Sequence, residues 1–358
     1  MPHPNTEKTS PVLGALAAVV VCLSAMAFMS LLGGSAWADE SGAVGFLSGH
    51  GELTPSEGLS SVADELSSRY AIREVELAAG DDLSGIRVLV VAGNPDIPDA
   101  ELYEIDQYLM RGGRILFLLD AALLPEQGFQ SNVSPANVFG FLETYGVVVN
   151  PDLVFDRSCA TGTTWNEVST DDPYPLWPRL SADNVSSQGP LAGLTSLQLA
   201  FSSSITTSWE MPGSTRASVL ARSSDESWTE SAYTSLDPES IPPPGVRSAE
   251  ATKVAADQGF PLAVSVAGRF DSAFLGRKLI VEREGKVEVV DPVDMIELGA
   301  TTAMVVFGSS VSFSDEFVGL YPENVDVLTR TVDWLAGDAP LVEAPAGATA
   351  SPDRRTAE

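Results

Sequence analysis

Hydrophobic and polar positions follow a strand, helix, strand pattern between residues 87 and 120. Residues 88–91 form a short apolar run rich in β-branched side chains, which is typical of a strand covered on both faces. A helix is predicted next, with Pro98 in its first turn and an apolar stripe at Leu102, Ile105 and Leu109. Residues 115–119 are a second apolar run. The spacing therefore predicts a right-handed βαβ crossover on a parallel sheet.

Strand-like and helix-like hydrophobic patterns also occur before and after this unit. Residues 43–47 and 72–77 have the pattern of strands, and between them Thr54-Pro55-Ser56-Glu57 has the pattern of a capping box that starts a helix. Another helix is predicted after Ser134-Pro135, and a strand at 153–155 would complete the sheet. Later segments with a regular pattern are strands at 217–221, 261–267 and 302–307, a hairpin at 278–290 and a helix at 324–336.

The alternating elements predict an α/β fold: a doubly wound, mostly parallel sheet of the Rossmann or flavodoxin type, with a β-rich, loop-rich insert or second subdomain. The expected divisions are an α/β domain at 43–156, a loop-rich, β-containing region at 157–300, a returning strand and helix at 301–337, and a disordered tail at 338–358. If the chain returns to its first sheet, Val305 and Leu328 should share a core with Val90.

The N-terminal segment has a different pattern. Residues 1–10 are expected to be cytoplasmic, and within the segment 11–38 the run 12–32 contains no charge and is long enough to span a bilayer. Ala36-Trp37-Ala38 has the small-x-small form of a cleavage site, so the segment is either an uncleaved anchor or a signal peptide. An anchored chain would sit in the inner membrane with its soluble part on the extracytoplasmic side. A cleaved chain would be periplasmic or secreted.

Charge narrows the choice of partner. The 358-residue chain has a formal net charge of −29 and a pI of about 4.2. A surface this acidic repels the phosphate backbone of nucleic acids. A nucleic-acid-binding role is therefore not expected.

Polar residues follow several predicted strands, where an open α/β sheet binds its ligands. These residues are Ser48, His50, Glu52, Asn94 and Asp120, with Ser309 and Ser310 as further candidates. An imidazole beside a carboxylate can perform acid–base chemistry or contact a ligand or partner, or it can simply shape the turn before a helix. SGHGE at 48–52 lacks the lysine of a Walker motif and the spacing of GxGxxG. No GxSxG nucleophile elbow occurs either, so catalysis is not expected.

Metal and cysteine chemistry are also not expected. Cys22 lies in the apolar N-terminal run and Cys159 stands alone, so two soluble cysteines are not available for a disulfide. His3 and His50 are the only imidazoles, which leaves no zinc framework. We therefore predict no metal site and no cofactor.

Several motifs resemble a known family. VGFLSGHGE at 44–52, VLVVAGNPDIPDAELYEIDQYLMRGGRILFLLD at 88–120 and YGVVVNPDLVFD at 145–156 are similar to segments of the GldG-like auxiliary components of ABC-type transport systems, which are named for gliding motility. SSDESWTES at 223–231, GFPLAVSVAGRF at 259–270, VVFGSSVSFSDE at 305–316 and NVDVLTRTVDWLAGD at 324–338 agree in order. The resemblance covers roughly residues 43–338.

The resemblance implies a non-enzymatic, membrane-anchored extracytoplasmic subunit that works beside an ABC permease and an ATPase. It also implies a fold similar to that of an intraflagellar-transport protein domain, and more distantly to glutamine-amidotransferase-like sheets without the catalytic cysteine. Two other functions stay open from the residues alone. One is a small-ligand or glycan-binding module at the strand ends around His50 and Glu52. The other is a divergent hydrolase, for which no nucleophile is evident.

Overall fold

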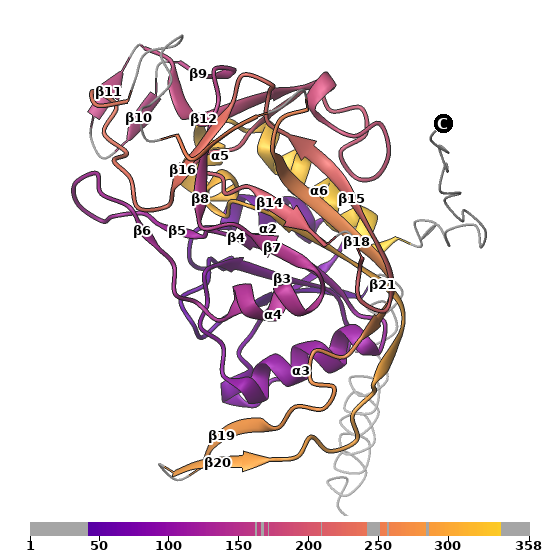
Figure 1. Ribbon diagram of the computed structural model, residues 1–358. Coiled ribbons are helices and arrows are strands. Elements are labelled where there is room, and N and C mark those ends of the chain that lie inside the picture. The colour runs from indigo at the N-terminus through magenta and orange to yellow at the C-terminus, as the bar shows by residue number, and fades with distance from the viewer. Residues whose placement is uncertain are drawn as a thin grey trace, which may run out of the picture. The chain divides into compact units, whose positions relative to one another are not determined.

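A seven-stranded sheet forms the centre of the protein (Figure 1). The computed structural model describes residues 42–337, except 162, 166–167, 171, 209, 242–250, 256–257 and 284–285. The strands lie in the order β15-β18-β21-β4-β3-β1-β2. Their bounds are β1 Ala43–Leu47, β2 Ala71–Val75, β3 Ile86–Gly93, β4 Arg114–Leu119, β15 Ser214–Arg222, β18 Pro261–Asp271 and β21 Leu298–Phe307.

The direction of these strands overturns the predicted fold class. Strands β2, β1, β3, β4 and β21 are mutually parallel, but β18 is antiparallel to β21, and the edge strand β15 is antiparallel to β18. The sheet is therefore mixed, and the prediction of a doubly wound, mostly parallel Rossmann or flavodoxin-like fold is wrong. The apolar run in β18 shows burial on both faces, and burial on both faces does not reveal the direction of a strand.

Six small antiparallel sheets among the described residues make the fold richer in strands than predicted. They pair β5 (Ala122–Leu123) with β6 (Asn132–Val133), β7 (Val147–Val149) with β14 (Ile205–Thr207), β10 (Thr163–Trp165) with β11 (Val168–Thr170), and β19 (Leu279–Arg283) with β20 (Lys286–Val290). Two have three strands: β8 (Asp152–Phe155) with β16 (Trp228–Ser231) and β17 (Lys253–Val254), and β12 (Tyr174–Ser181) with β9 (Cys159–Ala160) and β13 (Ser196–Gln198). The strand predicted at 153–155 is thus real but pairs outside the main sheet, so that pairing prediction is wrong.

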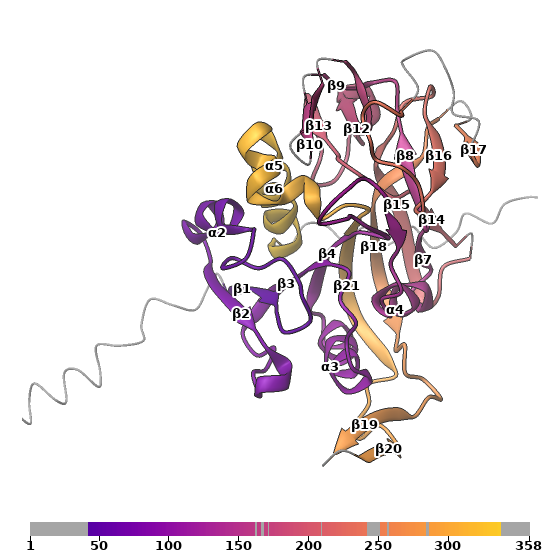
Figure 2. The ribbon, with the colours of Figure 1, turned by 90° about the vertical axis from the view of Figure 1, so that its left-hand side faces the viewer.

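Helices lie on both faces of the main sheet (Figure 2). The helices are α2 (Ser60–Ser67), α3 (Asp99–Met110), α4 (Val138–Thr144), α5 (Asp315–Leu320) and α6 (Glu323–Ala336), with short 3₁₀ turns at Leu77–Ala79, Ala182–Asn184 and Val311–Phe313. The predicted βαβ unit is confirmed, because β3 and β4 are parallel neighbours joined through α3.

Two of the three core clusters among the described residues lie on opposite faces of the main sheet, because alternate side chains of a strand point to opposite sides. Leu89 and Val91 pack with α3 and α4, whereas Val90 packs with α2 and α6. Val305 and Leu328 share this second cluster with Val90, as expected for a chain that returns to its first sheet. Strands β15 and β18 of the predicted loop-rich region also belong to the main sheet.

The segment predicted to span a membrane, 12–32, lies outside the described residues. Within residues 42–337, apart from the gaps stated above, no helix has the length and apolar character needed to cross a bilayer.

The start of α2 differs from the predicted capping box. Thr54 and Glu57 instead close a tight turn by exchanging backbone hydrogen bonds, each 3.0 Å. The helix begins at Ser60, and the Asp315 carboxylate accepts hydrogen bonds from the Ser60 and Ser61 amides at 2.9 and 2.7 Å. The cap is therefore supplied from α5, about 250 positions later in the chain. A local sequence pattern cannot reveal such a cap.

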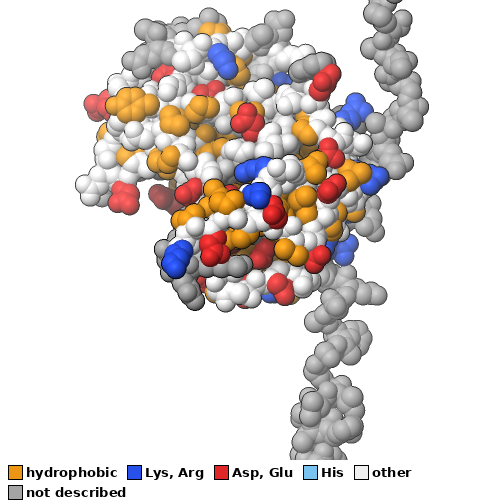
Figure 3. Space-filling view, turned by 60° about the horizontal axis from the view of Figure 1, so that its bottom comes forward, with side chains coloured by type: hydrophobic (Ala, Val, Ile, Leu, Met, Phe, Trp, Pro, Cys, Tyr) orange, Lys and Arg blue, Asp and Glu red, His pale blue; other side chains and the backbone are white. Residues whose placement is uncertain are grey.

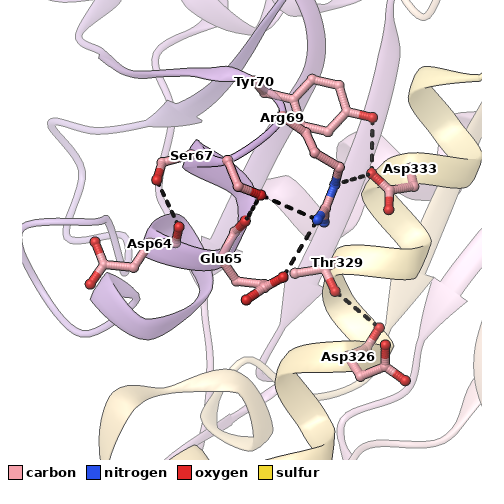
Figure 4. Close-up of polar contacts among 9 residues, drawn as sticks. Asp64, Glu65, Ser67, Arg69, Tyr70, Asp326, Thr329 and Asp333 are labelled. Atoms are coloured by element: carbon pink, nitrogen blue, oxygen red, sulfur yellow. Dashed lines mark hydrogen bonds and ion pairs between the residues drawn. The ribbon is translucent and has the colours of Figure 1, made fainter.

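Polar contacts also join α2 to α6 (Figure 4). The Asp333 carboxylate accepts hydrogen bonds from the Arg69 guanidinium at 3.1 Å and from the Tyr70 hydroxyl at 2.9 Å. Burial, and then the hydrogen bond to Asp333, raises the pKa of Tyr70 to about 12. At the far end of α6, Arg87 and Arg114 donate to its last carbonyl groups, which places positive charge at the negative end of the helix dipole.

One buried carboxylate connects α3 to its surroundings. Asp106 has no exposed surface and accepts hydrogen bonds from Tyr145 at 2.5 Å, from Gln107 at 2.8 Å, and from the Ser272 hydroxyl and the Ala273 amide at 2.8 Å. Tyr145 follows α4, and Ser272 follows β18. Asp106 therefore holds three segments together on one face of the sheet.

Replacing Asp315 by Asn should lower the free energy of unfolding by about 1 kcal/mol at pH 7, because α2 loses its charged cap. Partial burial acts to raise the pKa of Asp315, but the hydrogen bonds from Ser61 and Ser60 outweigh it and leave the pKa below its usual value. A lowered pKa stabilises the fold above about pH 4 and loses that contribution as the pH falls through the folded-state pKa. Urea denaturation across this range measures the difference between the two proteins.

The exposed Glu316 lies in the same helical turn, so Glu316→Gln serves as the control and should change stability by less than about 0.5 kcal/mol. A gap between wild type and Asp315→Asn that stayed constant down to pH 2 would rule out this role for the carboxylate.

Candidate functional site

The turn that carries the predicted imidazole lies across the carboxyl end of β3. The Leu53 amide donates to the Ala92 carbonyl at 3.0 Å, and the Ser48 amide donates to the Val75 carbonyl of β2 at 3.0 Å. Gly49 and Gly51 have φ values of +111° and +80°, a region that side chains with a Cβ disfavour. The two glycines allow the chain to reverse on both sides of His50 and bring its ring back over the sheet.

His50 lies between two buried carboxylates. Its Nδ1 is 3.0 Å from Glu52 Oε1, and its backbone amide donates to Glu52 Oε2 at 2.7 Å. On the other side, His50 Nε2 is 3.3 Å from Glu101 Oε2 in the first turn of α3. Glu52 and Glu101 are only 3% and 8% exposed. The imidazole therefore joins the turn to the crossover helix, and a protonated ring can donate to both carboxylates.

This arrangement supports a structural role better than nucleophilic catalysis. The imidazole has its carboxylate partners, but among the described residues no hydroxyl or thiol forms a hydrogen bond with its ring. Nucleophilic catalysis needs such a group within hydrogen-bond reach of the base. The contact of Glu101 with His50 was not predicted from the sequence. The position of Glu101 in the helix that follows β3 was the available signal.

Asp120 belongs to a separate hydrogen-bonded group at the same edge of the sheet. Its amide donates to the Gly93 carbonyl at 3.3 Å, while its carboxylate accepts from the Ser310 amide at 2.7 Å and from the Ser310 hydroxyl. Burial raises the pKa of Asp120, and the hydrogen bonds from Ser310 oppose that effect. Ser309 donates to the Ala200 carbonyl at 2.7 Å. These groups tie the end of β4 to the end of β21.

The structure thus brings the predicted residues to one edge but does not gather them into one site. His50 and Glu52 are in contact, whereas Asp120 is paired with Ser310. Asn94 follows β3 directly and is half-buried, and Ser48 contributes a backbone hydrogen bond to β2. Whether these residues bind a ligand or partner stays a prediction.

A different hollow was not predicted from the sequence. It is open, has a volume of about 440 Å³, and is lined by Asp183, Asn184, Arg222, Ser223, Ser224, Asp225 and Gln258. Burial lowers the pKa of the half-buried Arg222, whose guanidinium donates to the Gly259 carbonyl at 3.4 Å. The lining comes from three separate segments, so no local motif marks the hollow.

Metal and thiol chemistry gain no support from the described part of the chain. No group of His, Cys, Asp or Glu side chains there has an arrangement that could hold a metal ion. Burial raises the pKa of the free Cys159 to about 12, which keeps it a thiol near neutral pH. A thiol is a much weaker nucleophile than a thiolate.

Comparison with protein families gives a clear result. A family model described as an ABC-type uncharacterized transport system, within the auxiliary class of such systems, matches residues 42–331. The chain belongs to this family. The match begins at β1, ends within α6, and therefore includes the whole main sheet. No curated protein matches the chain.

Two solved structures are similar to this member of the ABC auxiliary family. The mmIFT52 N-terminal domain has 16% identity and a TM-score of 0.48, with 82% of this chain and 98% of that chain covered. A putative ThuA-like protein from Bacteroides uniformis has 11% identity and a TM-score of 0.39, with 84% of this chain and 93% of that chain covered.

Replacing His50 by Ala should lower the free energy of unfolding by about 1–3 kcal/mol, because Glu52 and Glu101 would stay buried without the imidazole between them. Chemical denaturation at pH 7 measures the loss. Glu104 is an exposed residue of α3, the helix that contains Glu101, and Glu104→Gln is the control. This variant should change stability by less than about 0.5 kcal/mol. Unchanged stability in His50→Ala would contradict a structural role for His50 and would favour the hypothesis that it binds a ligand.

Proposed function

We propose that the protein is a non-enzymatic accessory subunit of an ABC-type transport system, anchored in the cytoplasmic membrane with its folded part on the extracytoplasmic side. Its partners would be an ABC permease and an ATPase. The family match over residues 42–331 carries this proposal, because the family is an auxiliary component of such systems. The GldG-like assignment, with a role in gliding motility, is a narrower version of the same proposal.

Two further observations support the proposal. The uncharged run at 12–32 has the length of a transmembrane helix, and no Lys or Arg lies between Lys8 and Arg69. In addition, the polar groups that catalysis would need are paired with each other, as His50 is with Glu52 and Asp120 is with Ser310. The same pairing gives less support to a ligand-binding module at the strand ends, since a ligand would have to displace these hydrogen bonds.

Purification of the tagged full-length protein from membranes in a mild detergent should recover a permease and an ATPase in comparable amounts. Mass spectrometry should also find residues 1–38 intact. A chain that carries a cleavable signal peptide in place of residues 1–38 is the control, and it should leave the membrane fraction. Recovery of a soluble protein that starts at Asp39, without any transporter subunit, would refute the proposal.

A further inference from the structure

Exposed apolar side chains are concentrated in one part of the protein. Six of the eleven large hydrophobic residues that are exposed in the described chain fall between positions 275 and 298. They are Leu275, Ile280, Val287, Val289, Val293 and Leu298. Strands β19 and β20, which form a two-stranded ribbon here, project beyond α3 in Figure 1, and Figure 3 shows hydrophobic side chains among charged ones on that side. A concentration of this kind marks an interaction surface.

The ribbon has one covered face and one open face. Leu279, Val281 and Val290 pack against the core cluster on the α3 side of the sheet. Ile280 pairs with Val289, so these two side chains share the opposite face, and Val287 joins them two residues along the strand. Their exposed fractions are 56%, 62% and 70% for Ile280, Val289 and Val287. The open face is therefore an apolar strip.

The ribbon also has a free edge. The Ile280 amide donates to the Asp99 carboxylate of α3 at 3.1 Å, so it points away from β20. Ile280 and Val289 are then a non-hydrogen-bonded pair, and the amide and carbonyl of Val289 point away from β19. Hydrogen-bonded and non-hydrogen-bonded pairs alternate along an antiparallel ribbon, so the amide and carbonyl of Val287 also point away from β19. No other strand among the described residues pairs with β20.

Contacts with α3 hold the ribbon, and with it the free edge of β20, in position. Besides the bond from Ile280 to Asp99, the Tyr103 hydroxyl donates to the Val293 carbonyl at 2.9 Å. The loop before β19 is tied to the buried Asp106 through Ser272 and Ala273. An edge that is fixed before binding loses less conformational entropy when a partner adds to it.

We propose that the free edge of β20 binds an extended segment of a partner protein by strand addition. The segment has a basic residue opposite Glu288 and apolar residues opposite Val287 and Val289. Main-chain hydrogen bonds to Val287 and Val289 supply the attachment, and the apolar strip continues onto the added strand. Because Glu288 is exposed at the middle of this edge, a Lys or Arg across from it is favoured over an acidic residue.

A second copy of this chain and a lipid surface fit the edge less well. Pairing two β20 strands so that Val287 faces Val289 places Glu288 directly opposite Glu288 of the second copy, and like charges in that position destabilise a sheet. A lipid bilayer provides no partners for the unpaired amides of Val287 and Val289. The exposed carboxylates of Asp291 and Asp294 add repulsion from anionic headgroups.

Assigning this segment to the extracytoplasmic part of the ABC permease rests on the proposed function. Strand addition itself does not, because it depends only on the geometry and charge of β20. A direct binding test with synthetic peptides therefore separates failure of the ribbon proposal from failure of the transporter proposal.

The test is fluorescence anisotropy of two labelled peptides titrated with the purified full-length protein. One peptide has Val-Lys-Val flanked by threonines, and the other has Val-Glu-Val in the same frame. The lysine peptide should bind about tenfold more tightly than the glutamate peptide, and Glu288→Lys should reverse that preference. Val289→Pro should abolish binding, since it removes an outward amide, whereas Lys278→Gln in the same region should leave binding unchanged.

Equal binding of the two peptides, or a preference that does not reverse in Glu288→Lys, would overturn the proposal. The reversal does not depend on Val289→Pro, so a folding defect in the proline variant leaves the test intact. Cysteines at positions 287 and 289 together, introduced as Val287→Cys and Val289→Cys, report on a second copy of this chain, because each would face the other across two paired β20 strands. Efficient disulfide-linked homodimers in membranes would show that a second copy, rather than a different protein, covers this edge.

Discussion

Buried aspartates impose the strongest constraint on this fold, because a carboxylate removed from water must find donors within the protein. Serines supply many of them. The buried aspartates pair as Asp106 with Ser272, Asp152 with Ser204 and Asp156 with Ser224. The partly buried Asp120 with Ser310, and Asp315 with Ser60 and Ser61, follow the same pattern. Each pair joins segments at least 52 positions apart in the chain. Some of the acidic side chains therefore lie inside the protein rather than on its surface. Their hydrogen bonds fix the positions of strand ends, loops and helix starts.

This use of carboxylates bears directly on function. At the edge of the sheet where an enzyme would place its catalytic groups, His50 lies between Glu52 and Glu101, and Asp120 is hydrogen-bonded to Ser310. The open features lie elsewhere, above all on the ribbon of β19 and β20, where apolar side chains and backbone amides remain available. An exposed apolar edge of this kind suits a protein that binds other proteins, and the chain belongs to an auxiliary transport family.

The sequence predicts local structure well where a single element determines it. The strand at 43–47, the βαβ unit and the hairpin at 278–290 all form, because their periodicity and turn residues are contained in the segment itself. Predictions that need distant partners fail. The direction of β18, the pairing of β8 outside the main sheet and the cap of α2 by Asp315 depend on segments far away in the chain. The site shows the same limit: the turn brings His50 to Glu52, but Glu101 and Ser310 arrive only through the fold.

The most direct test of this account is the stability of Asp106→Asn, measured by chemical denaturation. The side chain of asparagine has one NH₂ group in place of a carboxylate oxygen. That NH₂ group would face at least one of the buried groups that now donate hydrogen bonds to Asp106. We expect a loss of at least about 2 kcal/mol. Asp326→Asn, on the exposed face of α6, is the matched control and should lose less than about 0.5 kcal/mol. Equal stabilities of Asp106→Asn and the wild type would contradict the claim that buried aspartates organise the fold.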